Sequence, residues 1–553
     1  MNKNWSRKEI AYQIYPKSFK DSNGDGVGDI QGIISKLDYL QDLGVTLLWI
    51  GPIYKSPMID NGYDVEDYYD IDPQFGTIKD IDELIEEAKK RNIKIIMDLV
   101  INHTSYKHKW FQDILKNKNS PYRDYYIIRK GKNHKAPNNW RSLFGGPIWE
   151  EIGNTNEFYL HTFTKEQPDL NWENPKMREE IYKMINWWLE KGIAGFRLDA
   201  INCMKKSDLS INGQPDASDG LCNCLQYVRE IDGIEKYYQE MKSKTFDLYN
   251  CVTVTEAVGV DRERWKHYIG KNGNFSMMFN FDTTYIDVID EDWFRRTNWT
   301  KKEFKKIFIQ SQNKMQRVGW QATFIENHDQ PRAINKYVSN EKERNYYSKT
   351  MLAAMYFFLR GTPFIYQGQE IGMENAQRTT IKDFDDVNTI AQYYRAMNEG
   401  YSKEEALNFM NLRSRDNART PMQWSDKENA GFSTKRPWLK LNDNYKTINV
   451  EQQKEDPNSI FNFYKKIIDM RKNSEYSKTL IYGKFKRIKI EDDEIIAYMR
   501  YNKHKQLDII CNFSNNKKEI EFNSKNVILS NYNKIHKNIL MPYQVVIVEK
   551  DLD

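Results

Sequence analysis

The stretch "IKIIMDLVINH", residues 93–103, is a run of apolar and β-branched residues that carries one aspartate and ends in a histidine. Near-continuous hydrophobicity without strict alternation is typical of a parallel strand that is covered on both faces. The segment before it, "IDELIEEAKKRN", has apolar residues at helical spacing. A helix followed by a buried strand is the unit from which α/β folds are built.

Seven more apolar runs of similar length repeat this arrangement along the chain. They are "IAYQIYP" (10–16), "VTLLWI" (45–50), "AGFRLDA" (194–200), "CVTVTEA" (251–257), "SMMFNF" (276–281), "ATFIENHD" (322–329) and "TPFIYQG" (362–368). A second helical segment, "MREEIYKMINWWLEKG", precedes the fourth strand, and Gly192 at its end suits a helix C-cap. Eight alternating units predict an α/β fold, a (β/α)8 TIM barrel.

Two segments depart from this repeat. Residues 104–173 are rich in aromatic residues, Asn and Gly, and a structureless loop of that length is unusual in a compact domain. From about residue 478, short alternating runs such as "EIIAYMRY" and "YQVVIVEK" predict an antiparallel β-sandwich. We therefore expect a barrel (1–103 and 174–477), an inserted subdomain after the third strand (104–173) and a C-terminal β-sandwich domain (478–553).

Composition argues against several classes of function. The chain has 553 residues, 39% of them hydrophobic, and its 83 basic and 78 acidic residues give a net charge of +5. This near balance favours no nucleic-acid groove, and no apolar run is long enough to predict a membrane span or a signal peptide. Five scattered cysteines lack the spacing of a zinc site and predict reduced thiols in a cytoplasmic protein.

Charged residues gather where the predicted strands end. An acid at one strand end is usually a local cap, since Asp readily bonds to nearby backbone. The carboxyl ends of barrel strands, however, meet at one face, where active sites form. Several charged residues at the same face therefore indicate chemistry. They are Asp98 and His103 in the third strand segment, Arg197 and Asp199 in the fourth, Glu256 in the fifth, and His328 and Asp329 in the seventh.

A cluster of carboxylates without a Cys/His metal set suits glycoside hydrolysis. One acid must be protonated to donate to the leaving oxygen, and another must be ionised to attack the sugar carbon. Neighbouring like charges raise the pKa of one carboxyl, and a nearby cation such as Arg197 lowers that of another. The aromatic residues of the insert would overhang the third and fourth strands, where aromatic faces can stack on sugar rings.

At this point the chain resembles the α-amylase superfamily (glycoside hydrolase family 13), in its bacterial oligo-1,6-glucosidase and α-glucosidase branch. The matching order and spacing run from residue 11 to beyond residue 420, and the tail with "MPYQV" also resembles the C-terminal domain of the family. The stretches that carry the resemblance are "AYQIYPKSFKDSNGDGVGDIQGI", "DNGYDVEDY", "DLVINHTS", "QPDLNW", "GFRLDA", "TVTEA", "ENHDQPR" and "RDNARTPMQW".

The resemblance implies an exo-acting, retaining α-glucosidase. It would release glucose from the non-reducing end of short α-1,4- or α-1,6-linked glucosides, or from sucrose. Asp199 would be the nucleophile, Glu256 the general acid/base and Asp329 the acid that stabilises the transition state. We expect a monomer with no organic cofactor. The residues implied for substrate binding are Asp60, Tyr63, His103, Phe144, Phe163, Gln167, Arg197, Ala200, His328 and Arg415.

Two positions depart from the branch. Thr255 stands before the catalytic glutamate, where the branch usually has Gly. Ala200 follows the nucleophile, where Val accompanies a preference for α-1,6 linkages. Ala removes two methyl carbons beside the leaving-group subsite, and a change of that size alters discrimination by about 1–3 kcal/mol. We expect maltose-type or sucrose-type linkages to be accepted at least as well as isomaltose.

The stretch "DSNGDGVGD", residues 21–29, has the spaced oxygens of a calcium loop. A calcium-sensor loop needs a bidentate acid at its twelfth position, which here is Gly32, so that interpretation fails. Related α-glucosidases bind an ion at this stretch. The resemblance therefore implies one structural Ca²⁺, with Mg²⁺ as the alternative ion. Its expected ligands are Asp21, Asn23, Asp25, Asp29 and the carbonyl of Val27.

Three alternatives stay open. A trehalose-6-phosphate hydrolase of the same branch would need cations at its outer subsite, for which Lys205 and Lys206 are the candidates. A sucrose isomerase would carry an Arg-rich loop after the seventh strand, where "NHDQPRAINKY" resembles the hydrolases instead. A non-catalytic relative, such as the heavy chains of amino-acid transporters, would have lost the catalytic acids and gained a membrane helix.

Overall fold

Eight parallel strands close into a barrel in the order of their sequence, which confirms the predicted TIM barrel. The computed structural model describes residues 3–550, so residues 1–2 and 551–553 of the expected domains lie outside the described part. The barrel strands are β1 (Ala11–Ile14), β2 (Leu47–Ile50), β5 (Lys94–Val100), β10 (Gly195–Asp199), β12 (Val252–Thr255), β13 (Met277–Phe279), β16 (Gln321–Thr323) and β17 (Thr362–Tyr366).

Side chains alternate between the inside of the barrel and the surrounding helices. Within β5, Ile96 belongs to the cluster inside the barrel, whereas Ile95 and Met97 pack on the outer one. Asp98 has the same parity as Ile96, so it points inward. In β12, Val252 and Val254 belong to the inner cluster. The alternation of side chains along a strand therefore points these acids into the barrel, and those at the carboxyl ends of the strands lie at the open face.

Helices cover the outside of the barrel. Helix α5 (Pro175–Lys191) begins at Asn174, whose side chain accepts from two backbone N–H groups, and ends at Gly192 with a φ of 106°. This C-cap confirms the expected glycine in the left-handed region. The other helices of eight or more residues are α3 (Ile78–Lys90), α4 (Lys109–Lys116), α7 (Glu235–Lys244), α9 (Lys301–Val318), α11 (Tyr346–Phe357), α12 (Val387–Asn398), α13 (Lys403–Arg413) and α15 (Ile460–Asn473).

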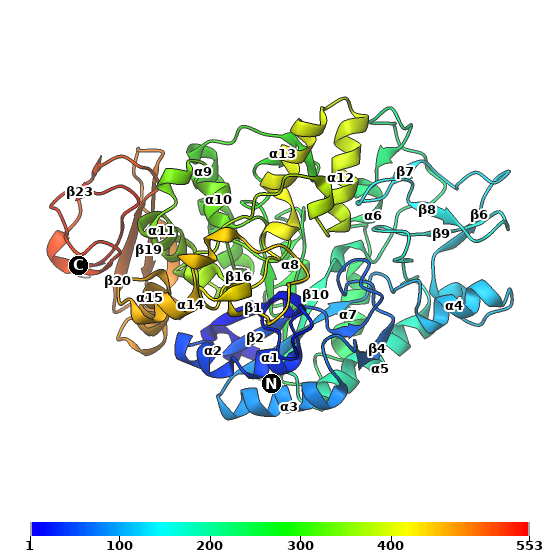
Figure 1. The fold of residues 1–553 in the computed structure, drawn as a ribbon, viewed down its shortest axis with the longest axis horizontal. Coiled ribbons are helices and arrows are strands. Elements are labelled where there is room, and N and C mark those ends of the chain that lie inside the picture. Colours follow the sequence, from blue (N-terminus) through cyan, green and yellow to red (C-terminus); the bar gives the residue numbers. More distant parts are fainter. Residues whose placement is uncertain (1–2, 551–553) are drawn as a thin grey trace.

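The segment after β5 carries its own small sheet, which lies at the opposite end of the molecule from the C-terminus (Figure 1). Strands β6 (Ile128–Lys130), β9 (Glu157–Leu160) and β8 (Trp149–Glu151) pair antiparallel. A further strand, β7 (Trp140–Arg141), pairs with β11 (Cys222–Asn223), which follows β10 in the chain. The loop after the fourth barrel strand is thereby joined to this segment.

The C-terminal part is an antiparallel sheet of five strands in the order β18-β19-β20-β24-β22, with the two-stranded sheet β21-β23 beside it. The expected boundary at residue 478 falls inside helix α16 (Ser477–Tyr482). The strands of the C-terminal part are β18 (Lys484–Arg487), β19 (Ile495–Tyr501), β20 (Gln506–Asn512), β21 (Lys518–Glu519), β22 (Val527–Ser530), β23 (Ile539–Leu540) and β24 (Val545–Lys550).

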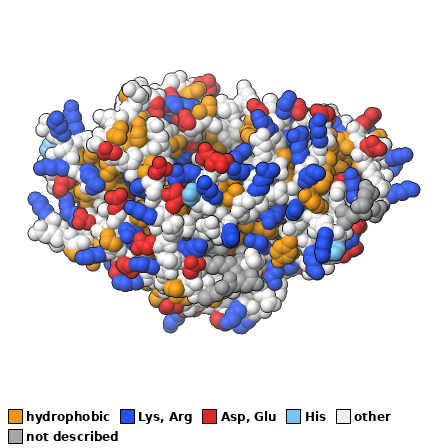
Figure 2. Space-filling view, turned by 180° about the vertical axis from the view of Figure 1, so that it is seen from behind, with side chains coloured by type: hydrophobic (Ala, Val, Ile, Leu, Met, Phe, Trp, Pro, Cys, Tyr) orange, Lys and Arg blue, Asp and Glu red, His pale blue; other side chains and the backbone are white. Residues whose placement is uncertain are grey.

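The surface carries charges of both signs. On the face shown in Figure 2, Lys and Arg side chains are interspersed with Asp and Glu, as the small net charge leads one to expect. Across residues 3–550, no helix combines the length and the apolar character needed to cross a membrane.

Candidate active site

The three acids that the resemblance implies as catalytic lie together at the carboxyl end of the barrel. Asp199 is the last residue of β10, Glu256 follows β12 directly, and both line one cavity with Asp329. The seventh strand is shorter than predicted, because β16 ends at Thr323. Asp329 instead sits in a turn in which its backbone N–H donates to Asn327 Oδ1 at 2.9 Å.

Arg197 joins the acids from the side. Its Nη1 lies 2.5 Å from Asp98 Oδ1 and 2.8 Å from Asp199 Oδ1, and its Nη2 bonds to Glu256. The arginine side chain is only 1% exposed. One buried guanidinium thus bridges three carboxyl groups, and Trp49 Nε1 donates to the remaining oxygen of Asp98 at 2.9 Å.

The environments of the acids differ. Burial raises the pKa of Asp199 and that of Glu256, although Arg197 opposes both shifts. Burial would also raise the pKa of Asp329, but His328 and the guanidinium groups of Arg415 and Arg419 hold it well below its usual value. Asp329 is therefore ionised at neutral pH, whereas burial favours the protonated forms of Asp199 and Glu256.

His328 connects Asp329 to the barrel interior. Gln13 Nε2 lies 2.7 Å from His328 Nδ1, and the other ring nitrogen of His328, Nε2, faces Asp329. That nitrogen lies 2.9 Å from Asp329 Oδ2 and 2.6 Å from the Tyr63 hydroxyl. The rings of Tyr63 and His328 are stacked, with centroids 5.5 Å apart. The two rings form a rigid floor beside the catalytic acids.

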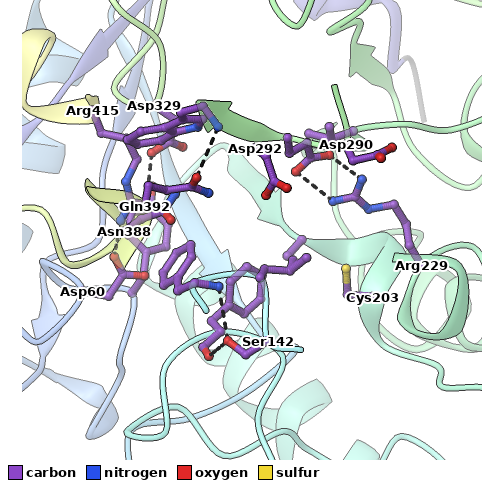
Figure 3. Close-up of a pocket in the computed structure, with 18 of the residues that line it drawn as sticks. Asp60, Ser142, Cys203, Arg229, Asp290, Asp292, Asp329, Asn388, Gln392 and Arg415 are labelled. Carbon is purple, nitrogen blue, oxygen red and sulfur yellow. Dashed lines mark hydrogen bonds and ion pairs between the residues drawn. The ribbon is translucent and has the colours of Figure 1, made fainter. Parts of the chain in front are cut away.

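An ion pair closes one end of the cavity. Arg415 Nη2 lies 2.8 Å from Asp60 Oδ1 and 2.5 Å from Asp386 Oδ1. Asp60, Asp329 and Arg415 lie on one side of the cavity, and Arg229 and Asp290 lie on the other (Figure 3). Asp60, Gln167 and His103 are all buried at this end, where Gln167 Nε2 bonds to Asp60 at 3.2 Å and to His103 Nε2 at 3.1 Å.

Aromatic residues of the insert form one wall. Phe144 and Phe163 meet edge to face with centroids 5.4 Å apart, and Phe163 also contacts the ring of His103. The guanidinium of Arg415 lies 5.0 Å from the centroid of the Phe144 ring. The structure thus brings every predicted substrate-binding residue to this cavity or to the groups directly behind it.

The two positions that depart from the branch, Ala200 and Thr255, lie in different surroundings. Ala200 lines the cavity with a φ of 41° and a ψ of 32°, a left-handed conformation that few residues other than Gly adopt readily. Thr255 lies on the side of β12 opposite to Glu256, because neighbouring residues of a strand alternate. Its buried hydroxyl finds no hydrogen-bond partner among the described residues.

The outer side of the cavity contains residues that the sequence did not single out. They come from loops, from helix α12 and from the short strands β7 and β15, which lie outside the barrel, so no barrel-strand pattern marks them. The turn between β14 (Val288–Ile289) and β15 (Asp292–Arg296) supplies part of this wall. The unpredicted lining residues include Arg141, Arg229, Tyr285, Asp290, Glu291, Asp292, Trp293, Asn388, Gln392 and Arg395.

The lysines considered for phosphate binding have other partners. Lys206 Nζ lies 2.8 Å from Asp169 Oδ2, and the side chain is 3% exposed. Lys205 bonds to the backbone carbonyl of Asp232, and both lysines line a different cavity. The structure does not bring them into the cavity that holds Asp199.

The loop of residues 21–29 folds around its own backbone. Asp21 accepts from the N–H groups of Gly24 and Gly26 at 2.7 and 2.9 Å, and Asp29 accepts from Gly32 N–H at 2.6 Å. Asp21 and Asp29 are 3% and 5% exposed. In residues 3–550, His, Cys, Asp and Glu side chains form no group of three that could hold a metal ion. Two of the expected ligands, the Asn23 side-chain amide and the Val27 backbone carbonyl, are not among these four side-chain types.

Comparisons with known proteins agree with this geometry. Residues 13–483 match the family model described as the alpha amylase catalytic domain. The chain is 43% identical over 540 residues to an oligo-1,6-glucosidase of Parageobacillus thermoglucosidasius, covering 96% of this chain and 95% of that protein. It is 40% identical to a trehalose-6-phosphate hydrolase of Bacillus subtilis, covering 92% and 90%. The crystal structure of an isomaltulose synthase from Klebsiella sp. LX3 superposes with a TM-score of 0.93 at 36% identity, covering 99% of both chains.

Proposed function

Because the chain belongs to the α-amylase family, glycoside hydrolase family 13, we propose that it is a retaining, exo-acting α-glucosidase that acts on short α-glucosides. The observation that carries this proposal is the arrangement of Asp199, Glu256 and Asp329 around a cavity closed at one end by the Asp60–Arg415 ion pair. A closed end admits a single terminal glucose, so cleavage removes one glucose unit at a time.

In the mechanism, Glu256 acts as the general acid and base, and Asp199 acts as the nucleophile. With the proton on Glu256, that residue donates to the departing oxygen while ionised Asp199 attacks the anomeric carbon and forms a glycosyl ester. Arg197 holds the nucleophile at 2.8 Å and compensates its charge. Glu256, now deprotonated, then takes a proton from water, which hydrolyses the ester with overall retention.

Asp329 stabilises the positive charge that develops on the sugar. Its pKa is held below its usual value by His328 and two arginines, although burial opposes this, so it stays ionised throughout the cycle. A fixed anion in a buried site acts strongly on a developing cation, because little water screens it. The same groups can bind the hydroxyls of the terminal glucose.

Turnover of an α-glucoside panel tests this function. The wild type should release glucose from at least one of maltose, isomaltose, sucrose and trehalose 6-phosphate, with the α-anomer formed first. Asp199→Ala should lose at least about 10³-fold in kcat, because the covalent step depends on this carboxylate. Equal activity of the two proteins, or release of the β-anomer, would contradict the mechanism.

The linkage preference follows from Ala200, beside the nucleophile. Several relatives are named oligo-1,6-glucosidases, but a small side chain here leaves room for the leaving sugar of maltose or sucrose. We expect Ala200→Val to shift the ratio of kcat/KM for isomaltose over maltose upward by about tenfold, within the 1–3 kcal/mol of a methylene-scale change. A strong isomaltose preference in the wild type would contradict this expectation.

The same substitution should also reduce stability. A β-branched side chain at a φ of 41° is strained, and such strain costs on the order of 1–3 kcal/mol. Melting temperatures of the wild type, Ala200→Val and Ala200→Gly separate the two effects. Glycine should stabilise the turn or leave it unchanged, and it should not favour isomaltose.

The loop of residues 21–29 is proposed as a structural Ca²⁺ site, with Mg²⁺ as the alternative ion. Asp21, Asn23, Asp25, Asp29 and the Val27 carbonyl would hold the ion, and these oxygen donors suit hard cations. Asp21 and Asp29 are both buried in this short loop, and the closeness of two buried carboxyl groups supports a bound cation. The ion would act on the fold and not on the substrate.

The cellular setting is part of the proposal. The five cysteines are all buried, and Cys203, Cys222, Cys224 and Cys511 are free thiols, which suits the reducing cytoplasm. We expect a monomer.

A further inference from the structure

The outer part of the cavity is unusually rich in charge, and its positive groups are already paired. Seven carboxyl groups and four guanidinium groups line the whole cavity. The acids are Asp60, Asp199, Glu256, Asp290, Glu291, Asp292 and Asp329, and the arginines are Arg141, Arg229, Arg395 and Arg415.

Arg229 lies across the cavity from Asp60 and Arg415 (Figure 3) and pairs with Glu291. Nη1 and Nη2 of Arg229 lie 2.5 and 3.3 Å from the two carboxylate oxygens of Glu291, so the contact is bidentate. The arginine side chain is 12% exposed. This geometry uses the fork that would otherwise recognise a phosphate, because Arg binds both anions in the same manner.

Glu291 is held in an unfavourable backbone conformation to make this contact. Asp290 and Glu291 form the turn between β14 and β15, with φ values of 52° and 64°. Such turns favour Gly, Asn and Asp, and Glu is an uncommon choice. The strain persists only where surrounding contacts hold it, and the pair with Arg229 is the contact that the structure shows.

The other arginines of the cavity are neutralised as well. Arg395 Nη1 lies 2.6 Å from Asp292, and Arg141 bonds to Asp216 and Asp219 at 2.5 and 2.7 Å. Asp290 adds a carboxylate for which the described residues provide no ion pair. Among the described residues that line the cavity, an anionic leaving group would therefore meet carboxylates and only those arginines that already have a carboxylate partner.

We propose that the outer subsite accepts only uncharged leaving groups, and that Glu291 is the residue that determines this by occupying Arg229. The proposal rests on the proposed glucosidase function, and it separates this chain from the trehalose-6-phosphate hydrolase to which it is similar. Removal of one partner from a partly buried ion pair leaves an uncompensated charge. Loss of the Glu291 charge would turn Arg229 into an anion site.

The test compares a phosphorylated substrate with uncharged ones. The measured ratio is kcat/KM for trehalose 6-phosphate divided by kcat/KM for the best uncharged disaccharide. In the wild type, kcat/KM for the uncharged disaccharide should be at least tenfold higher than kcat/KM for trehalose 6-phosphate. Glu291→Gln should raise the ratio at least tenfold, and the double variant Glu291→Gln with Arg229→Gln should abolish the gain.

Asp290→Asn is the matched control, because it removes the same charge from the same turn without freeing an arginine. An equal gain in Asp290→Asn and Glu291→Gln would overturn the role of Glu291. A wild-type ratio above one would overturn the proposal even if Glu291→Gln fails to fold, as judged by its melting curve. No turnover of any uncharged α-glucoside, including p-nitrophenyl α-glucoside, would instead count against the proposed function itself.

Discussion

Glu256 and Asp199 both contact the guanidinium of Arg197, and burial raises the pKa of each carboxyl. Because the pKa of Glu256 is raised, its proton is retained above the usual range of a glutamic acid and is lost as the pH rises through the shifted value. The alkaline limb of the kcat/KM profile should therefore lie above pH 4.5, the ordinary value for this group.

Replacement of Glu256 by glutamine tests its role in catalysis and its effect on stability. Glu256→Gln should lower kcat by about 10²–10⁴-fold, the usual contribution of a general acid/base. A raised pKa in the folded state means that folding favours the protonated form, so the native carboxyl costs stability as the pH rises. The melting temperature of the variant should exceed that of the wild type at pH 8, and the difference should shrink toward pH 4. A variant that melts lower at pH 8 would contradict this assignment.

At the scale of elements, a buried arginine joins the C-terminal sheet to the barrel. Arg500 in β19 donates from Nη1 to the carbonyl of Phe358, at the end of helix α11, at 2.7 Å. Its Nη2 donates to the carbonyl of Gly483 at 3.0 Å. Burial lowers the pKa of Arg500 to about 9, which still leaves it charged at neutral pH. A cation at a helix C-terminus also interacts favourably with the helix dipole.

Arg500→Met should therefore weaken the contact between these two parts. A hydrogen bond from a charged group contributes about 1.5–3 kcal/mol, so loss of two such bonds should destabilise the protein by at least about 3 kcal/mol. Thermal and urea unfolding measure the change. Arg487→Met, on an exposed position of β18 in the same sheet, is the matched control and should lie within about 0.5 kcal/mol of the wild type. Similar losses in both variants would argue against a role for the buried contact.

The strands and the loops differ in how far the sequence predicts them. Each barrel strand is marked by its own apolar residues, and parallel strands bring their carboxyl ends to one face, so Asp199 and Glu256 could be placed together from local patterns. The apolar run 322–329 predicts a strand that ends at Asp329, but β16 ends at Thr323 and the Asn327 side chain forms a turn before Asp329. Glu291 and Arg229 lie 62 residues apart and meet only through the packing of two loops. The spacing of apolar residues predicts helices and strands but not contacts between distant loops, so the sequence does not predict the outer wall.

At the scale of the whole molecule, the loop of residues 21–29 ties the first barrel unit to a segment some 400 residues later. The backbone N–H of Asp21 donates to the carbonyl of Phe432 at 3.2 Å, and Ser433 Oγ donates to Asp21 Oδ2 at 2.5 Å. The N–H of Trp438 donates to the carbonyl of Gly26 at 3.0 Å. Burial would raise the pKa of Asp21, but the bonds from Ser433 and from loop amides hold it below its usual value.

Chelation should therefore loosen a long-range contact without removing a catalytic group. An ion present at 100 times its Kd stabilises the folded state by about 2.7 kcal/mol, so saturating EDTA should lower the melting temperature and Ca²⁺ should restore it. The kcat measured below the melting transition should stay the same. Asp25→Asn should remove most of the response to Ca²⁺, whereas Glu521→Gln, an equal charge change at an exposed position of the C-terminal domain, should keep it. A melting temperature that neither EDTA nor Ca²⁺ moves would mean that the loop is stabilised by its own amide hydrogen bonds, and that its acids serve only to form the turn.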